Sequence, residues 1–140
     1  EYIKEKNLGP DALEVNKQEF VNILKNKNSL IKSALTDQTA LSGIGNVYAD
    51  EILYQAKVHP RERTSKISEA KMNKLFEEMN RVLKTAIDKN AEVSKMPNDF
   101  LLPVRDKDNS CPGCKGKLEI IKISGRTTYY CPSCQKLSDG

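Results

Sequence analysis

Apolar positions recur at helical spacing through the first two thirds of the chain. The first run places apolar residues at i, i+3 and i+4, namely Phe20, Ile23 and Leu24. This spacing predicts a short amphipathic helix. Asn28 and Ser29 can cap a second helix just after it. The pattern therefore predicts short helices that each bury one face.

Helical spacing resumes after an irregular segment at 39–46, and His59-Pro60 is expected to end this third helix. Ser68 is a favourable N-cap for a fourth and longest helix. That helix carries a continuous apolar stripe: Met72, Leu75, Phe76, Met79, Val82, Leu83 and Ile87. Such a stripe indicates core packing rather than a cofactor site.

The pattern changes after the longest helix. Residues 91–109 lose periodicity, contain two prolines and a charged run, and are predicted to be a connector. Two runs rich in β-branched and aromatic residues follow at 117–123 and 126–130, and Ser124-Gly125 between them predicts a hairpin turn. The expected fold is therefore mainly α, in three parts: a helical domain (1–90), a connector (91–109) and a small β-hairpin unit (110–137).

Composition is typical of a compact protein outside the membrane. The 140 residues suit one small domain with an appended unit, and 38% hydrophobic residues supply a modest core. No run approaches the roughly 18 apolar residues that a transmembrane helix requires, and no charged-then-apolar leader opens the chain. We expect a soluble, cytoplasmic monomer with no membrane partner. The net charge of +4 is too small to predict nucleic-acid binding by itself.

Four cysteines predict a structural zinc site. They form two Cys-x2-Cys pairs separated by sixteen residues: Cys111, Cys114, Cys131 and Cys134. Two residues between thiolates let one tight turn present both sulfurs to one ion, and two such turns supply the tetrahedral sulfur set that Zn²⁺ prefers. A closed set of four protein ligands is structural rather than catalytic. Two disulfides are the alternative, although nothing in the sequence marks secretion.

No catalytic constellation is evident in the sequence. His59 is the only histidine, and we interpret it as a polar residue at a helix end. Asp50 and Glu51 are adjacent on a helix, so their carboxylates point in different directions and are not expected to form a dyad. We therefore expect no catalytic residue in this chain.

The irregular segment before the third helix is a candidate anion-binding turn. Free N–H groups and the positive end of a helix dipole attract anions at such a position. Gly43 and Gly45 would let a phosphate approach, and the Asn46 amide can donate to it. Ile44 would anchor the turn in the core. Arg126 directly follows the hairpin turn, where it can reach a phosphate. Without further context, Gly-x-Gly-Asn is more commonly an ordinary capped turn.

The turn and the cysteine pairs together resemble the formamidopyrimidine-DNA glycosylase and endonuclease VIII family. The runs at 35–38 and 43–53 are similar to the family's helix-two-turns-helix motif, and residues 8–11 are similar to the lead-in to its helical domain. Both cysteine pairs and the run at 125–130 resemble its C-terminal zinc finger, spacing included. The resemblance covers nearly the whole chain in the right order.

The resemblance implies the DNA-binding half of a bifunctional DNA glycosylase and AP lyase of base-excision repair. The family forms a Schiff base through an N-terminal proline on a β-rich domain, whereas this chain starts at Glu1 and is expected to be a non-catalytic fragment. Gly43, Gly45, Asn46 and Arg126 are implied to grip the backbone of double-stranded DNA. The everted nucleotide carries an oxidised base or is an abasic site. One structural Zn²⁺ and a bacterial, nucleoid-associated location are also implied.

Other functions stay open at this point. A stand-alone zinc-ribbon module can bind nucleic acid without catalysis, including structured RNA, because a related helix-two-turns-helix occurs in a ribosomal protein. A zinc-ribbon adaptor that binds protein is a further class, and the salt dependence of binding separates it from the others. Within the resembled family, the short segment at 92–109 favours a pyrimidine lesion, as in endonuclease VIII, over a purine lesion.

Overall fold

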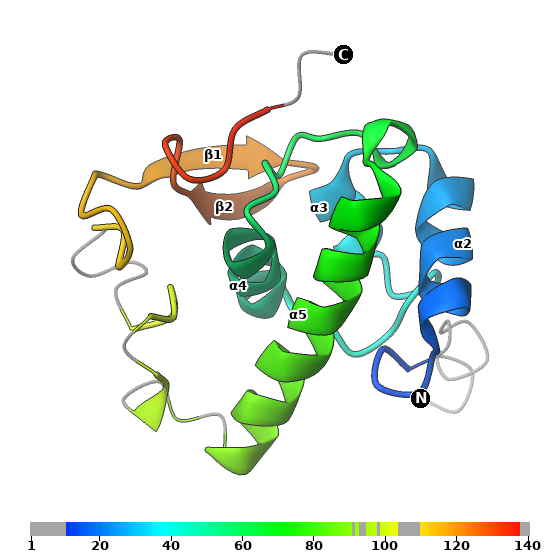
Figure 1. Cartoon of the computed structure of the whole chain (residues 1–140), viewed down its shortest axis with the longest axis horizontal. Coiled ribbons are helices and arrows are strands. Elements are labelled where there is room, and N and C mark those ends of the chain that lie inside the picture. The colour runs from blue at the N-terminus through cyan, green and yellow to red at the C-terminus, as the bar shows by residue number, and fades with distance from the viewer. Residues whose placement is uncertain (1–10, 91, 93–94, 98, 104–109, 138–140) are drawn as a thin grey trace.

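The computed structural model describes residues 11–90, 92, 95–97, 99–103 and 110–137. Its elements, in chain order, are α2 (Lys17–Lys27), α3 (Ile31–Thr36), α4 (Asn46–Ala56), the 3-10 helix η1 (Thr64–Lys66), α5 (Glu69–Asp88), β1 (Glu119–Ile123) and β2 (Arg126–Tyr130). Figure 1 shows α5 crossing in front of the other helices, with the hairpin above α4. Residues 8–10 of the lead-in motif and the charged run at 105–108 lie outside the described residues.

Capping side chains set the first residues of two helices. Asn16 Oδ1 accepts from the Glu19 amide at 2.8 Å, and the Glu19 carboxylate accepts from the Asn16 amide at 2.8 Å. This reciprocal capping box starts α2. Ser68 Oγ accepts from the Lys71 amide at 3.2 Å, which confirms the predicted N-cap of α5.

Two predicted helix boundaries are wrong. Asn28 does not cap the second helix: it is the C-cap of α2, with a left-handed φ of 45°. α3 begins after Leu30, which makes no side-chain cap bond. α4 ends at Ala56, before the predicted stop at Pro60. It ends there because Lys57 adopts a left-handed φ of 61° and turns its N–H back onto the last carbonyls.

The helices share one hydrophobic core, to which α5 contributes most of its predicted stripe. Met72, Leu75, Met79 and Val82 are fully buried, and Phe76 packs its ring 5.6 Å from that of Phe20. The stripe stops before the end of the helix, because Ile87 is 65% exposed. Within the described part of the chain, no helix combines the length and the apolar character needed to cross a bilayer.

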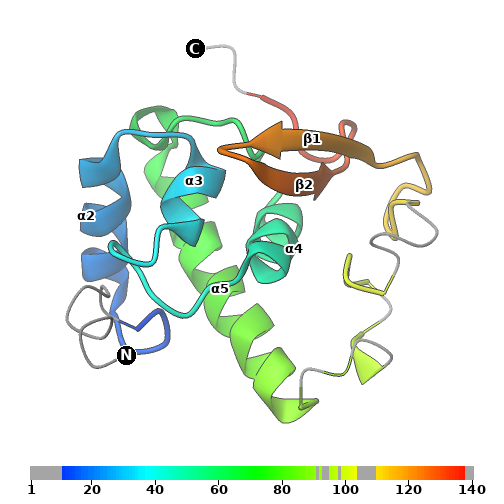
Figure 2. The ribbon, with the colours of Figure 1, turned by 180° about the vertical axis from the view of Figure 1, so that it is seen from behind.

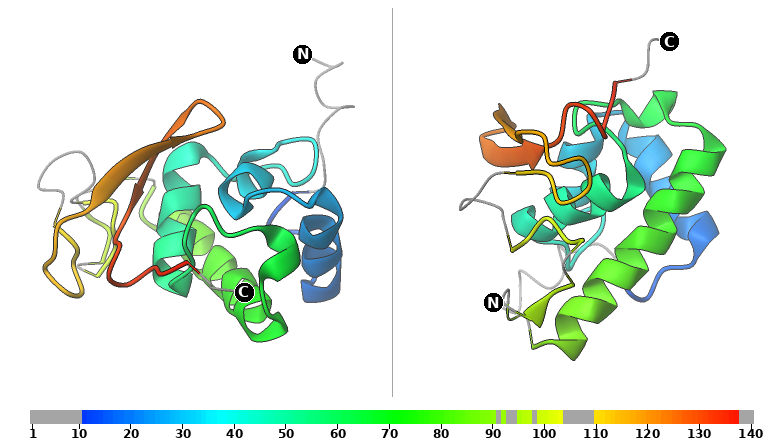
Figure 3. Two further views of the ribbon diagram at one scale, coloured as in Figure 1. Left: turned by 90° about the horizontal axis from the view of Figure 1, so that it is seen from above. Right: turned by 60° about the vertical axis from the view of Figure 1, so that its left-hand side comes forward.

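The hairpin forms a second, smaller packing unit against α4. β1 and β2 pair antiparallel, and Ser124 and Gly125 make the predicted turn with φ of 52° and 78°. Beneath the sheet lies a separate buried cluster: Tyr54, Leu101, Cys111, Leu118, Tyr129 and Cys131. Seen from behind and from above, the turn of the hairpin reaches toward α3 (Figures 2 and 3). The mainly α fold with a terminal hairpin is confirmed.

Candidate metal centre and nucleic-acid interface

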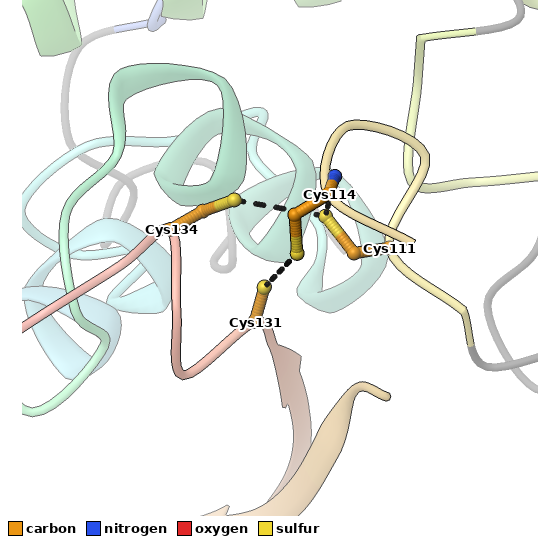
Figure 4. A group of neighbouring side chains, drawn as sticks. All are labelled: Cys111, Cys114, Cys131 and Cys134. Carbon is orange, nitrogen blue, oxygen red and sulfur yellow. Dashed lines mark hydrogen bonds between the residues drawn. The ribbon is translucent and has the colours of Figure 1, made fainter. Parts of the chain in front are cut away.

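The four cysteines meet at one point. Figure 4 shows Cys111 and Cys114 on the loop before β1, facing Cys131 and Cys134 at the end of β2. The four sulfurs lie within 4.8 Å of one another, with Cys111–Cys134 at 3.7 Å and Cys114–Cys131 at 3.5 Å. A tetrahedron with Zn–S bonds of about 2.3 Å separates its sulfurs by roughly 3.8 Å. The cluster therefore has the donor set and the spacing to hold one metal ion.

Ionisation of this cluster is uneven. Burial works against the Cys111 thiolate, but hydrogen bonds from the Cys114 amide and the Tyr54 hydroxyl outweigh it and lower the pKa of Cys111 to about 6. Burial and the neighbouring sulfurs raise the pKa of Cys134 to about 12. Four crowded sulfurs ionise together only when a cation neutralises them, which is what a metal ion does.

The glycine turn before α4 is braced by a side chain that sequence reasoning did not single out. Gln38 accepts from the Gly43 amide at 3.0 Å and donates to the Ile44 carbonyl at 2.9 Å. Gly43 has a φ of 100°, a conformation that L side chains rarely adopt. Ile44 is fully buried and anchors the turn, as predicted.

Gly45 leaves the N-terminus of α4 open. It is the N-cap residue, with φ −80° and ψ 170°, and no side chain caps the helix there. A Cβ placed on Gly45 would meet no atom of the described part of the chain within 4 Å. Packing against the described residues therefore does not require glycine at this position, Gly45 itself is exposed, and the first N–H groups of a helix have no partner within the helix.

The structure joins this turn to the hairpin arginine. Asn46 Nδ2 donates to the Thr127 carbonyl at 3.0 Å, so a side chain predicted to bind phosphate also ties α4 to β2. Asn46 Oδ1 is buried and has no hydrogen-bond partner among the described residues. Arg126, next to Thr127, is exposed. It lines a hollow of about 390 Å³ with residues of α3 and the turns: Ser33, Thr36, Asp37, Gln38 and Ser124.

A buried polar network lies directly beneath the hairpin. Lys32 of α3 forms an ion pair with Asp50 of α4, and both side chains are completely buried. Lys32 also donates to Thr128 Oγ1 at 2.8 Å, and Asp50 accepts from the Tyr129 amide at 3.1 Å. The network links α3, α4 and β2 and fixes the distance between the glycine turn and the hairpin. Sequence reasoning did not identify Lys32.

The neighbouring carboxylate, Glu51, has different partners from Asp50. Glu51 accepts from the Leu101 amide at 2.9 Å and from the Leu102 amide at 2.7 Å. Burial raises the pKa of Glu51. The bonds hold part of the predicted connector on the surface of α4. His59, predicted to lie at a helix end, lies beyond it; its Nδ1 accepts from the Arg61 amide at 3.0 Å.

Known proteins of one enzyme family match this chain over part of their own length. The family of the formamidopyrimidine-DNA glycosylase H2TH (helix-two-turns-helix) domain matches residues 8–98. A formamidopyrimidine-DNA glycosylase of Lactobacillus acidophilus is 37% identical over 143 residues, covering 93% of this chain and 51% of the relative. A formamidopyrimidine-DNA glycosylase of Arabidopsis thaliana is 38% identical, and 34% of its length is covered. The chain thus spans about half or less of these relatives.

Solved structures agree with this match. The Lactococcus lactis formamidopyrimidine-DNA glycosylase bound to DNA containing an AP site superposes with a TM-score of 0.81 at 32% identity, covering 96% of this chain and 52% of that one. A complex of the L. lactis enzyme with Fapy-dG-containing DNA gives a TM-score of 0.78 at 27% identity, covering 96% and 53%. The chain belongs to the formamidopyrimidine-DNA glycosylase H2TH family.

Proposed function

We propose that this chain is the half of a DNA glycosylase and AP lyase that grips the backbone of damaged double-stranded DNA. The observation that carries the proposal is the Asn46–Thr127 hydrogen bond, which joins the open N-terminus of α4 to Arg126 in one surface. One end of this surface offers backbone amides and a helix dipole, and the other end offers a guanidinium. This arrangement suits successive phosphates. Gly43, Gly45, Asn46 and Arg126 are the proposed contacts.

We propose that the four cysteines bind one structural Zn²⁺. Their spacing and all-sulfur donor set support zinc over an ion that prefers oxygen ligands, such as Mg²⁺ or Ca²⁺. The metal would close the two knuckles and so hold the hairpin that carries Arg126. Two hydrophobic clusters support a helical domain at 1–90 and a ribbon at 110–137, and the connector at 91–109 contributes to both: Met96, Phe100 and Leu102 pack into the helical cluster, and Leu101 packs under the hairpin together with Tyr54 of α4.

We propose that base excision and strand cleavage belong to the whole protein, with the reacting groups on another domain. Two of the L. lactis complexes contain an abasic site and Fapy-dG, respectively, and Fapy-dG is a purine-derived lesion. The DNA bound in these complexes favours a purine lesion for this protein over the pyrimidine lesion suggested by the segment at 92–109. Borohydride trapping of the full-length gene product on abasic duplex should yield a covalent adduct, and its absence would leave binding as the whole function.

The first test of the DNA contacts removes the hairpin guanidinium. Arg126→Ala is expected to weaken binding to duplex DNA with a central abasic-site analogue by about tenfold, because a hydrogen bond to a charged group contributes about 1.5 kcal/mol. Fluorescence anisotropy at fixed salt measures the change. Lys84→Ala removes the same charge from an exposed site on α5 and is the matched control. Equal affinities of the two variants would remove Arg126 from the contact set.

The second test uses the different surroundings of the two glycines. Gly45→Ala is expected to leave the thermal midpoint nearly unchanged, because its Cβ meets no described atom within 4 Å, yet to weaken DNA binding because the new methyl group would stand between the amides and a phosphate. Gly43→Ala is expected to reduce stability by about 1–3 kcal/mol, because its φ of 100° strains any L side chain. A Gly45→Ala chain that binds DNA like wild type would contradict a phosphate at the helix N-terminus.

A further inference from the structure

Tyr54 is a residue of α4 that reaches the cysteine cluster. Its hydroxyl oxygen lies 3.0 Å from Cys111 Sγ and accepts from the Gly113 amide at 3.1 Å. Only 2% of Tyr54 is exposed, so water competes little for either bond. A Cβ on Gly113 would approach the hydroxyl oxygen to 3.3 Å, so the first cysteine knuckle packs directly on this side chain.

The direction of the bond to sulfur follows from the chemistry of a thiolate. A metal-bound thiolate has no proton, so the Tyr54 hydroxyl must be the donor to Cys111. Its oxygen lone pair remains for the Gly113 amide, and both contacts are satisfied together. The Lys57 ammonium lies 4.5 Å from the centre of the Tyr54 ring. A cation over an aromatic face is attracted by the ring quadrupole, so this contact helps to hold the Tyr54 ring in place.

The second knuckle is tied to the same end of α4. Gln135 is fully buried, and its Oε1 accepts from the Cys131 amide at 2.8 Å. Its Nε2 donates to the Val58 carbonyl at 2.9 Å, just beyond the helix. The C-terminal end of α4 and the residues after it therefore contact one member of each cysteine pair, through Tyr54 and through Gln135.

We propose that Tyr54 is an outer-sphere residue of the metal centre, whose hydroxyl stabilises the Cys111 thiolate and fixes the first knuckle to α4. The inference rests on the proposed metal site at the four cysteines. Hydrogen bonds of this kind orient a metal ligand, and their loss typically lowers metal affinity by about 10–100-fold. α4 begins at Asn46 and carries Tyr54 near its other end, so one helix connects the proposed metal centre to the proposed phosphate-binding turn.

The test compares the whole chain with its Tyr54→Phe variant, which keeps the ring and removes the hydroxyl. Both are loaded with Co²⁺ as a spectroscopic probe and titrated with a competing chelator. We expect the Co²⁺ affinity to fall about tenfold. The sulfur-to-cobalt charge-transfer band should move to lower energy, because a thiolate without the donor holds its electrons less tightly. Tyr48→Phe, on the same helix but lining an apolar hollow with Leu83 and Ile87, should change neither.

Three other outcomes overturn the proposal. Unchanged affinity and an unchanged band in Tyr54→Phe would show that the hydroxyl does not act on the sulfur. A lower affinity with an unchanged band would assign the effect to the Gly113 contact alone. A wild-type chain that binds neither Co²⁺ nor Zn²⁺ would remove the metal centre itself, which distinguishes failure of the proposed site from failure of the role of Tyr54.

Discussion

Removal of the metal is expected to unfold the hairpin and both cysteine knuckles while the helices remain folded. Among the described residues, the cluster under the hairpin holds six buried residues, two of them cysteines, and a core of that size does not keep a small unit folded without the ion. The helical core is separate and continuous. In isolated finger peptides, structural zinc contributes about 10–16 kcal/mol of folding free energy. Loss of that free energy far exceeds the stabilisation that the remaining contacts of the ribbon supply.

Hydrogen exchange with and without a chelator measures this effect residue by residue. Amides of β1 and β2 should lose protection, whereas those of α2 and α5 should keep it, and added Zn²⁺ should restore the hairpin. Cys134→Ser should mimic chelation, with Ser133→Ala in the same knuckle as the matched control. One cooperative loss of all protection would contradict the division into a helical domain and a ribbon.

Replacing Lys32 by methionine is expected to lower the free energy of unfolding by about 3–5 kcal/mol, because the change leaves the Asp50 carboxylate buried without its counter-charge. Small domains are stable by only about 5–15 kcal/mol, so this is a large fraction of the total. The hairpin should also lose its docking on α3, since Lys32 bonds Thr128 as well. Urea denaturation of the metal-loaded chain gives the free energy directly.

A second substitution separates the charge effect from lost packing. In Lys32→Met with Asp50→Asn, the neutral amide can still accept from the Tyr129 amide, so most of the stability should return. Asp50→Asn alone leaves the Lys32 ammonium with a weaker partner and should lie between wild type and Lys32→Met. A double variant as unstable as Lys32→Met would show that the ion pair is not the source of the loss.

Features set by neighbours in the sequence could be predicted. The hairpin turn at Ser124-Gly125, the Ser68 cap and the convergence of the cysteine pairs each depend on residues within a few positions or on a fixed ligand geometry. The glycine turn was also recognisable, because a helix start after two glycines has few backbone solutions. In each case local chemistry leaves the chain little choice.

Features that depend on distant partners could not be predicted. Lys32 bonds a threonine 96 positions away, and only the folded chain brings a carboxylate to it as well. Tyr54 has the spacing of an ordinary core residue, and its contact with Cys111 spans 57 positions. The error in the predicted end of α4 has a different cause. Lys57 adopts the left-handed conformation that ends the helix, although glycine and asparagine are the residues that usually signal such an end.

The most direct test of the central claim is a salt titration of this chain on duplex DNA with an abasic-site analogue. Contact with phosphates through Arg126 and the α4 turn predicts that affinity falls steeply with salt, by roughly 0.9 in log K per log unit of salt for each phosphate neutralised. Binding should also be tighter than to the same duplex without the lesion. Absence of binding, or affinity independent of salt, would contradict a DNA-gripping surface at the glycine turn and the hairpin.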